Sequence, residues 1–377
     1  MNRLRALDPT VVVYLALVAS LVIGAVLVST VGRSFFSAGN IRDILTGMSV
    51  LGLVAIGQTL VILCSSLDLS VPTVISLSSL LAATTMAGDP ARIVPAVLLT
   101  LAVAAAIGLF NGLVVTKLKV NGFIATLGTG LIVKGYLDTQ YKGTAGSVPW
   151  EFQLIGATGL GPVPVSTVIM LVLATGVWFM LTRTRTGHQM FAVGGDPSVA
   201  RLSGLRVARP VIVAHVGCSL AAACAGLLLA ARLGVGSPTV GAQGGYDLLS
   251  IAAVVLGGTL LLGGRGSVWG TIGGVAIFAV LDNVMSVMQI NPFLKDIVRG
   301  VVIVAAVAVY TRRTMHVHRP RFGPDATAPS DGASLGDGVT PEGRVLPDDR
   351  ALPDDVRLPD DGPPATGAVP PGEEVAR

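Results

Sequence analysis

Long apolar runs separated by short polar segments repeat along most of this chain. Eight of the runs carry no charged residue at all, and they lie at 11–31, 44–63, 69–88, 93–116, 165–182, 210–231, 248–264 and 266–281. Two further runs, 122–137 and 292–311, contain a few charged residues. Because about 20 apolar residues in a helix cross a hydrocarbon core of ~30 Å, the pattern predicts about ten transmembrane helices. The expected fold is all-α, a polytopic integral membrane helical bundle.

The composition agrees with lipid as the main solvent. Charged residues make up 13% of the chain, about half of the ~25% that is usual in soluble domains. The three cysteines lie in or beside apolar runs without metal-ligand spacing, so we interpret Cys64, Cys218 and Cys224 as small buried residues and expect no metal site.

The charges between the runs predict which loops are cytoplasmic. The first run is too long for a signal peptide and no cleavage site follows it, so we expect a retained first helix that starts inside. Ten spans then place most of the basic residues on the cytoplasmic side, in the segments 117–119 and 183–209, at Arg265 and at 312–313, as the positive-inside rule expects. The basic residues that fall outside are Arg33, Arg42, Arg92, Lys142 and Arg232. We expect the chain to lie in the inner membrane, with both termini in the cytoplasm. The basic residues are loop anchors in this interpretation, and we expect no nucleic-acid partner.

The last part of the chain has a different composition. Residues 1–320 carry 21 Lys and Arg against 10 Asp and Glu, whereas residues 321–377 carry 5 against 12. The second segment is rich in Pro, Gly and Asp and repeats Leu-Pro-Asp-Asp at 346–349, 352–355 and 358–361. Such a segment cannot bury a core, so we predict a transmembrane domain over 1–320 and a disordered acidic cytoplasmic tail over 321–377.

A polar break interrupts the apolar pattern at 64–72, Cys-Ser-Ser-Leu-Asp-Leu-Ser-Val-Pro. A carboxylate at membrane depth is costly and usually faces a cavity or a partner, which favours a broken helix on a solute path. An ordinary short loop, with Asp68 capping the next helix, fits equally well. Other polar residues in the spans have two interpretations: they line the path of the solute, or they form hydrogen bonds between neighbouring helices. The candidate path residues are Gln58, Asp68, Ser70, Asn121, Thr126 and Asn283.

The largest basic segment, 183–209, also contains a helix start. Gly194-Gly195-Asp196-Pro197 is a turn in which Asp196 can cap a helix that has Pro197 in its first position. The helix expected over 198–205 has an apolar edge at Val199, Leu202 and Leu205. It could lie on lipid headgroups or dock into a groove on another protein.

The motifs of two enzyme classes are missing. No Gly-x-x-x-x-Gly-Lys-Ser/Thr phosphate loop occurs, so the chain does not carry its own ATPase of that type. The sequence also offers no readable Ser/His/Asp arrangement, because Gly-Arg-Gly-Ser at 264–267 follows no strand. We therefore expect a transport protein with no catalytic residue.

Four blocks together resemble the permease subunits of ATP-binding-cassette importers for monosaccharides, of the ribose and xylose type. The blocks are GQTLVILCSSLDLSV at 57–71, NGFIATLGTGLIVKG at 121–135, FAVGGDPSVARLSGL at 191–205 and LLSIAAVVLGGTLLLGGRGSVWGTIGG at 248–274. The resemblance covers roughly residues 40–312.

The resemblance implies a permease homodimer in the lipid bilayer, with two separate ATPase subunits and an extracytoplasmic sugar-binding protein as partners. ATP and Mg²⁺ would be bound by the ATPase, and this chain would need no cofactor. The cytoplasmic loop of such permeases, which couples them to the ATPase, matches Gly194, Gly195, Asp196, Pro197, Ala200, Arg201, Leu202, Ser203 and Gly204.

Two departures from the related permeases stand out. They usually have Gly-Gly-Ile-Asp-Leu-Ser-Val-Gly where this chain has Ser65 to Pro72, and Pro where it has Gly122. Importers of branched-chain amino acids or nucleosides share this general plan and remain alternatives. So does an ion-coupled secondary transporter, in which a buried Asp would carry the coupling ion.

Overall fold

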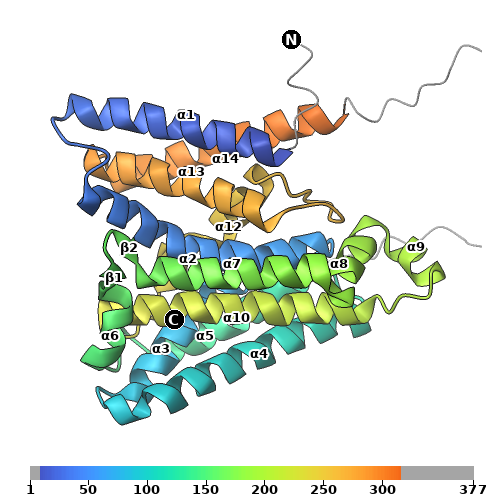
Figure 1. The fold of residues 1–377 in the computed structure, drawn as a ribbon. Coiled ribbons are helices and arrows are strands. Elements are labelled where there is room, and N and C mark those ends of the chain that lie inside the picture. The colour runs from blue at the N-terminus through green and yellow to red at the C-terminus, as the bar shows by residue number, and fades with distance from the viewer. Residues whose placement is uncertain (1–8, 316–377) are drawn as a thin grey trace, which may run out of the picture. The chain divides into compact units, whose positions relative to one another are not determined.

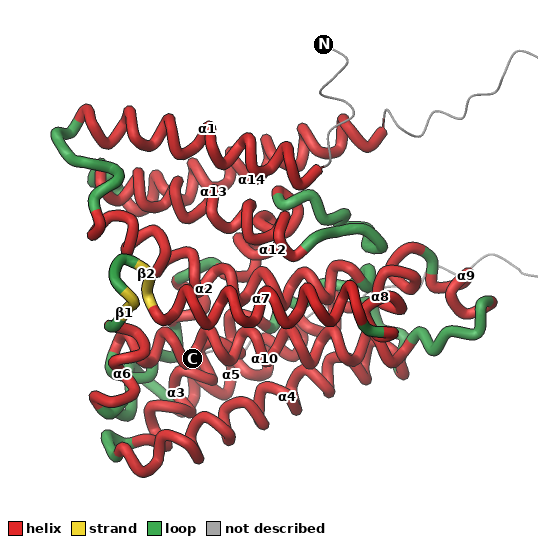
Figure 2. The backbone as a smooth tube through the Cα atoms, viewed as in Figure 1, coloured by secondary structure: helices red, strands yellow, loops and turns green. Residues whose placement is uncertain are grey.

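A computed structural model describes residues 9–315, which are almost entirely helical (Figures 1 and 2). The predicted tail and its Leu-Pro-Asp-Asp repeats lie outside the described residues. The helices are α1 Pro9–Thr30, α2 Ala38–Leu63, α3 Val71–Met86, α4 Ile93–Lys117, α5 Gly122–Gln140, α6 Trp150–Ala157, α7 Val165–Arg183, α8 Arg185–Gly195, α9 Pro197–Leu202, α10 Ala208–Leu233, α11 Val240–Gln243, α12 Tyr246–Leu256, α13 Val268–Val287 and α14 Pro292–Met315. Two short antiparallel strands, β1 Gly159–Leu160 and β2 Val163–Pro164, form a hairpin between α6 and α7.

Six of the described helices, α1, α2, α4, α7, α10 and α13, are long and apolar enough to cross a membrane. The apolar helices α3 and α12 are shorter. This confirms the prediction of an all-α polytopic membrane fold. A helix occupies each of the ten predicted runs, but the run 248–264 is helical only as far as Leu256. Gly257 to Ser267 form a loop instead, because the glycines there adopt backbone angles that a helix excludes, with φ of +88° at Gly258 and +89° at Gly263.

The core of the bundle lies around α2 and α10. Every residue of α2 from Met48 to Leu63 is buried, and α10 packs against α2, α3 and α4. Glycines allow these close approaches. A Cβ on Gly108 of α4 would come within 2.7 Å of Cα of Val216 on α10, and one on Gly57 of α2 within 2.9 Å of Cα of Cys218. Both contacts are too short for any side chain, so glycine sets the distance between these helices.

The peripheral helices carry apolar side chains on exposed faces. Val22, Ile23 and Val26 of α1 are each more than half exposed, and α4 and α5 have similar surfaces. Two of the cysteines, Cys64 and Cys218, are buried as predicted, Cys224 is half-buried, and all three are free thiols.

The two ends of the bundle carry different segments. The start of α1, the short helices α8 and α9, and the end of α14 lie at one end (Figure 1). The β1–β2 hairpin and α6 lie at the other end. We refer to these as the α9 end and the hairpin end.

Candidate functional site

Helix α9, at the α9 end, starts where the sequence predicts, but the predicted turn over Gly194 to Pro197 is wrong in part, because Gly194 and Gly195 belong to the last turn of α8. The Oδ1 atom of Asp196 accepts hydrogen bonds from the backbone N–H groups of Ser198 (2.7 Å) and Val199 (3.1 Å), and Pro197 occupies the first turn of α9. This confirms the predicted cap. The helix ends at Leu202, earlier than expected, and Gly204 follows with φ of +78°.

One face of α9 is exposed in the part of the chain that the structure describes. The Leu202 side chain is 90% exposed and Val199 57% exposed, whereas Ala200 is buried against the bundle. Leu205, the third residue of the predicted apolar edge, packs on the core instead. Arg201 and Ser203 are also exposed. The exposed surface of α9 is thus an apolar pair beside a basic residue.

A single joint connects α8 to the broken region after α2. The Ser65 hydroxyl lies 2.8 Å from the carbonyl oxygen of Gly194 and 2.5 Å from that of Leu262, and the N–H of Gly264 donates to the carbonyl of Leu63 (3.1 Å). Ser65 has φ of +58°, which costs on the order of 1 kcal/mol outside glycine. Three segments, the ends of α2 and α8 and the loop before α13, therefore meet at main-chain atoms. We call this contact the Ser65 joint.

Three residues after the joint, Asp68 lies at the centre of a buried polar network. Its Oδ1 atom accepts hydrogen bonds from the N–H (2.9 Å) and hydroxyl (2.5 Å) of Ser70, and that hydroxyl also lies 3.0 Å from Nδ2 of Asn111 on α4. The Thr126 hydroxyl of α5 accepts from the N–H of Leu69 (3.0 Å). The broken segment is thus tied to α4 and α5, and Asp68, Ser70, Asn111 and Thr126 are all buried.

In the same network, His215 lies between Asp68 and Ser66 and is close to both. Oδ2 of Asp68 lies 3.5 Å from Nδ1 of His215 on α10, and Nε2 of His215 lies 3.1 Å from the Ser66 hydroxyl. Sequence spacing does not reveal this arrangement, because His215 is 149 residues from Ser66. All three side chains are buried and none lines either of the two cavities described below. The arrangement holds the break against α10.

The position of Ser66 accounts for the glycine at position 122. A Cβ placed on Gly122 would collide with the Ser66 hydroxyl. A side chain at 66 and a side chain at 122 therefore compete for the same space.

The structure separates the remaining candidate path residues. Gln58 is buried in α2, with its Oε1 3.4 Å from Sγ of Cys218, and Asn121 caps α5 through the N–H of Phe123. Asn283 lies on α13 near the hairpin end, where it donates to Oδ1 of Asn40 (2.9 Å). Asp68, Ser70 and Thr126 are therefore together, and the other three are apart.

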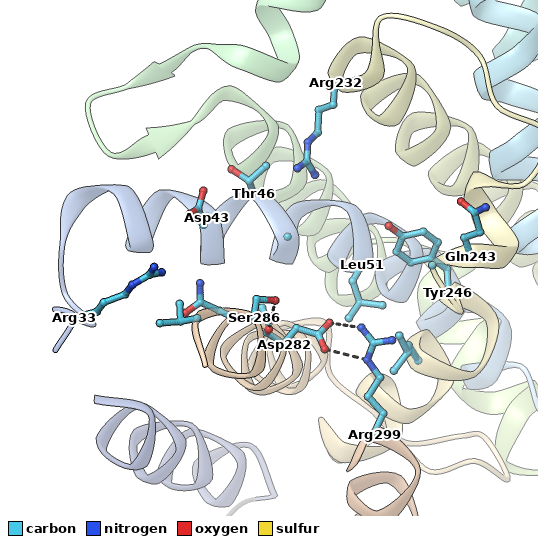
Figure 3. A pocket seen from close by; sticks show the side chains of 16 residues that line it. Arg33, Asp43, Thr46, Leu51, Arg232, Gln243, Tyr246, Asp282, Ser286 and Arg299 are labelled. Carbon is cyan, nitrogen blue, oxygen red and sulfur yellow. Dashed lines mark hydrogen bonds and ion pairs between the residues drawn. The ribbon is translucent and has the colours of Figure 1, made fainter. Parts of the chain in front are cut away.

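A cavity of about 540 Å³ opens beside Asn283 (Figure 3). Its charged lining residues come from four places along the chain, and they are Arg33, Asp43, Arg232, Asp282 and Arg299. The guanidinium of Arg299 binds both carboxylate oxygens of Asp282, at 2.9 and 3.0 Å. A second cavity of about 420 Å³ lies between residues 138–144 and 237–239.

Comparison with known proteins assigns this architecture to a family. Residues 40–307 match the family described as the permease component of branched-chain amino acid transport systems. The chain belongs to this permease family. The permease is 38% identical over 303 residues to the ribose import permease protein RbsC of Escherichia coli (strain K12), which covers 79% of this chain and 93% of the relative.

Two further relatives carry related names. The permease is 36% identical over 294 residues to RbsC of Bacillus subtilis (strain 168), covering 77% of this chain and 90% of that one. It is 33% identical over 295 residues to the galactose/methyl galactoside import permease protein MglC of Haemophilus influenzae, covering 73% and 87%. No solved structure matches the chain. The permease is thus a multi-pass membrane transport subunit and not an enzyme.

Proposed function

We propose that this permease is the membrane-spanning subunit of an ATP-binding-cassette importer that moves a monosaccharide into the cell. The observation that carries the proposal is the identity of 33–38% to ribose and galactose import permeases over about three quarters of the chain. The family description also names branched-chain amino acids, but the relatives at this identity are named for sugars.

The α9 end is the docking surface for the ATPase subunits in this proposal. A capped helix with two exposed apolar side chains and a nearby arginine suits a groove on a protein partner. The predicted coupling residues, Gly194 to Gly204, contain this helix. The Ser65 joint passes movement of α9 to the broken segment that holds Asp68. ATP and Mg²⁺ belong to the partner.

Docking of the ATPase at α9 also sets the orientation of the permease in the membrane. The α9 end and both termini are cytoplasmic, and the hairpin end receives solute from an extracytoplasmic binding protein. The exposed apolar faces of α1, α4 and α5 contact lipid or the second copy in a homodimer. Solute passes the polar residues Gln58, Asp68, Ser70, Asn121, Thr126 and Asn283 when helix movement opens a path among them.

The test combines purification and uptake. An affinity-tagged permease is extracted from its own membranes in mild detergent, and ATP hydrolysis by the co-purified ATPase is compared with that of the double variant Asp196→Lys/Arg201→Glu. We expect the ATPase to be lost from the variant only. Uptake of labelled D-ribose, D-xylose, D-galactose, L-leucine and adenosine is then measured in cells.

Each alternative gives a different result. Uptake of a sugar that vanadate blocks and an ionophore spares supports the importer. Uptake of leucine or adenosine alone would replace the sugar with another solute class. Uptake that stops with the ionophore, in a permease that brings down no ATPase, would point to the ion-coupled transporter.

A further inference from the structure

The cavity beside Asn283 lies where a solute would enter. It is bounded by the first turns of α2, the end of α10, the start of α12, the last turns of α13 and the first turns of α14. All of these lie toward the hairpin end (Figure 1), opposite to α9. Its volume of about 540 Å³ falls within the ~300–1,000 Å³ that is typical of small-molecule sites.

The cavity offers hydrogen-bonding groups that the protein itself leaves free. Asn283 uses its Nδ2 to bond Asn40, but its buried Oδ1 atom has no partner among the described residues. An unsatisfied buried polar atom is unfavourable, so a ligand hydroxyl that bonded it after a small movement of the Asn283 side chain would be stabilised there. Figure 3 shows Arg232 extending from the end of α10 toward Thr46 on α2, across the space that a ligand would occupy.

Paired charges line the same space. Arg299 and Asp282 form a bidentate ion pair whose side chains are 24% and 38% exposed, so both still have atoms open to the cavity. Arg299 is also 3.0 Å from the exposed Asp296, which does not line the cavity. Such a pair presents hydrogen-bond donors and acceptors side by side. Tyr246 and Leu249 add an aromatic and an aliphatic surface.

This lining suits a ligand with several hydroxyl groups. A hydroxyl group donates and accepts, so a molecule with several hydroxyls can bond Asp282, Arg299 and Asn283 at once. A ligand with one net charge would meet attractive and repulsive side chains together, because three arginines and two aspartates surround the space, whereas a neutral hydroxyl needs no counter-charge. The C–H face of a sugar ring is apolar enough to lie on the Tyr246 ring.

We propose that this cavity, the Asn283 pocket, is the first binding station for the solute, and that it takes a neutral polyhydroxylated molecule of monosaccharide size. The proposal rests on the importer function and adds the site and the chemical class. The station is distinct from the Asp68 network, which is closed in this structure. Binding there must be weak, since a station on a transport path has to release its solute.

Cysteine protection tests the station directly. Ser286 lines the pocket and is exposed, whereas Ser34 is exposed near the same end and does not line it. The variants Ser286→Cys and Ser34→Cys, each in the full complex in lipid nanodiscs, are labelled with a charged methanethiosulfonate. Both variants carry Cys224→Ser, because Cys224 is only half-buried, whereas the buried Cys64 and Cys218 contribute little background. Labelling rates are compared with and without the sugar that the wild type imports best among D-ribose, D-xylose and D-galactose.

We expect the sugar to slow labelling of Ser286→Cys at least threefold and to leave Ser34→Cys unchanged. Thr46→Cys, from the opposite wall of the pocket, provides the same readout if Ser286→Cys folds poorly. Protection by D-glucuronate and not by the neutral sugar would overturn the ligand class. Unchanged rates at both pocket cysteines, in a complex that imports the sugar, would overturn the station.

An uptake comparison gives a second measurement. Asp282→Asn removes a charge that lines the pocket, and the matched control Asp296→Asn removes the other partner of the same arginine outside it. We expect uptake to fall about tenfold or more in the first variant and to stay within twofold of wild type in the second. Equal uptake in both would refute the pocket. A wild type that imports no monosaccharide would instead refute the proposed function.

Discussion

Two adjacent glycines at the end of α8 provide a sharp test of the Ser65 joint. A Cβ added to Gly194 would collide with the carbonyl oxygen of Leu63 and lie 2.7 Å from the backbone nitrogen of Gly264. A Cβ added to Gly195 meets nothing within 4 Å. The variants Gly194→Ala and Gly195→Ala therefore make the same chemical change at neighbouring positions of one helix, and only the first disturbs the joint.

The expected cost follows from the contacts that must give way. The atoms facing Gly194 belong to backbone and cannot rotate aside, so overpacking costs ~1–3 kcal/mol. Either the end of α8 moves away and the bond from Ser65 to Gly194 is lost, or Leu63 and Gly264 separate and the bond between them is lost, at ~0.5–1.5 kcal/mol. The total is roughly 1.5–4.5 kcal/mol. Alanine recovers up to about 1 kcal/mol of helix propensity in both variants.

Thermal unfolding of the detergent-solubilised permease, followed by size-exclusion chromatography, measures the difference. We expect Gly194→Ala to lower the midpoint by roughly 5 °C or more and Gly195→Ala to leave it unchanged or slightly higher. Uptake should fall in the first variant alone. Equal midpoints for the two variants would show that α8 is free to move at this point and would refute the joint.

Three further substitutions test other parts of the structure. Leu202→Glu should release the ATPase subunits without lowering the unfolding midpoint. The control Leu160→Glu, at an exposed position of the hairpin, should retain them. An intact complex with Leu202→Glu would contradict docking at α9. Gly122→Ala should lower the midpoint because its methyl group displaces Ser66, and adding Ser66→Gly should restore most of the loss; two additive losses would be the contrary result. Asp68→Leu should cost about 3–5 kcal/mol, since the hydroxyl and N–H of Ser70 lose their buried acceptor and His215 loses the carboxylate 3.5 Å from its Nδ1, and a wild-type midpoint would disprove that account.

The apolar pattern predicted the helices well because lipid imposes one simple rule on sequence. A spanning helix must be long and uncharged, and the runs at 11–31 and 210–231 satisfy this plainly. The same rule failed at 257–264, where the residues are apolar but glycine-rich. Hydropathy does not register backbone angles, so the loop was hidden inside a predicted span.

The sites were only partly predictable. The cap at Asp196 depends on residues two and three positions away, and the sequence therefore revealed it. The contact between Asp68 and His215 joins residues far apart in the chain, and so do the walls of the Asn283 pocket. Of the six candidate path residues, only Asn283 lines that pocket. Such groupings depend on how the helices pack, which polarity along the chain does not encode.

The Ser65 joint has a consequence for how the sequence of this permease can evolve. Its acceptors are main-chain carbonyls of Gly194, Leu262 and Leu63, so the joint needs no particular side chain at Leu262 or Leu63 and, of the three positions, needs glycine only at 194. It also shares no residue with the Asn283 pocket at the hairpin end. Mutations that adapt the pocket to a new solute therefore leave the machinery at the α9 end intact, so that selection can act on the two ends of one molecule independently.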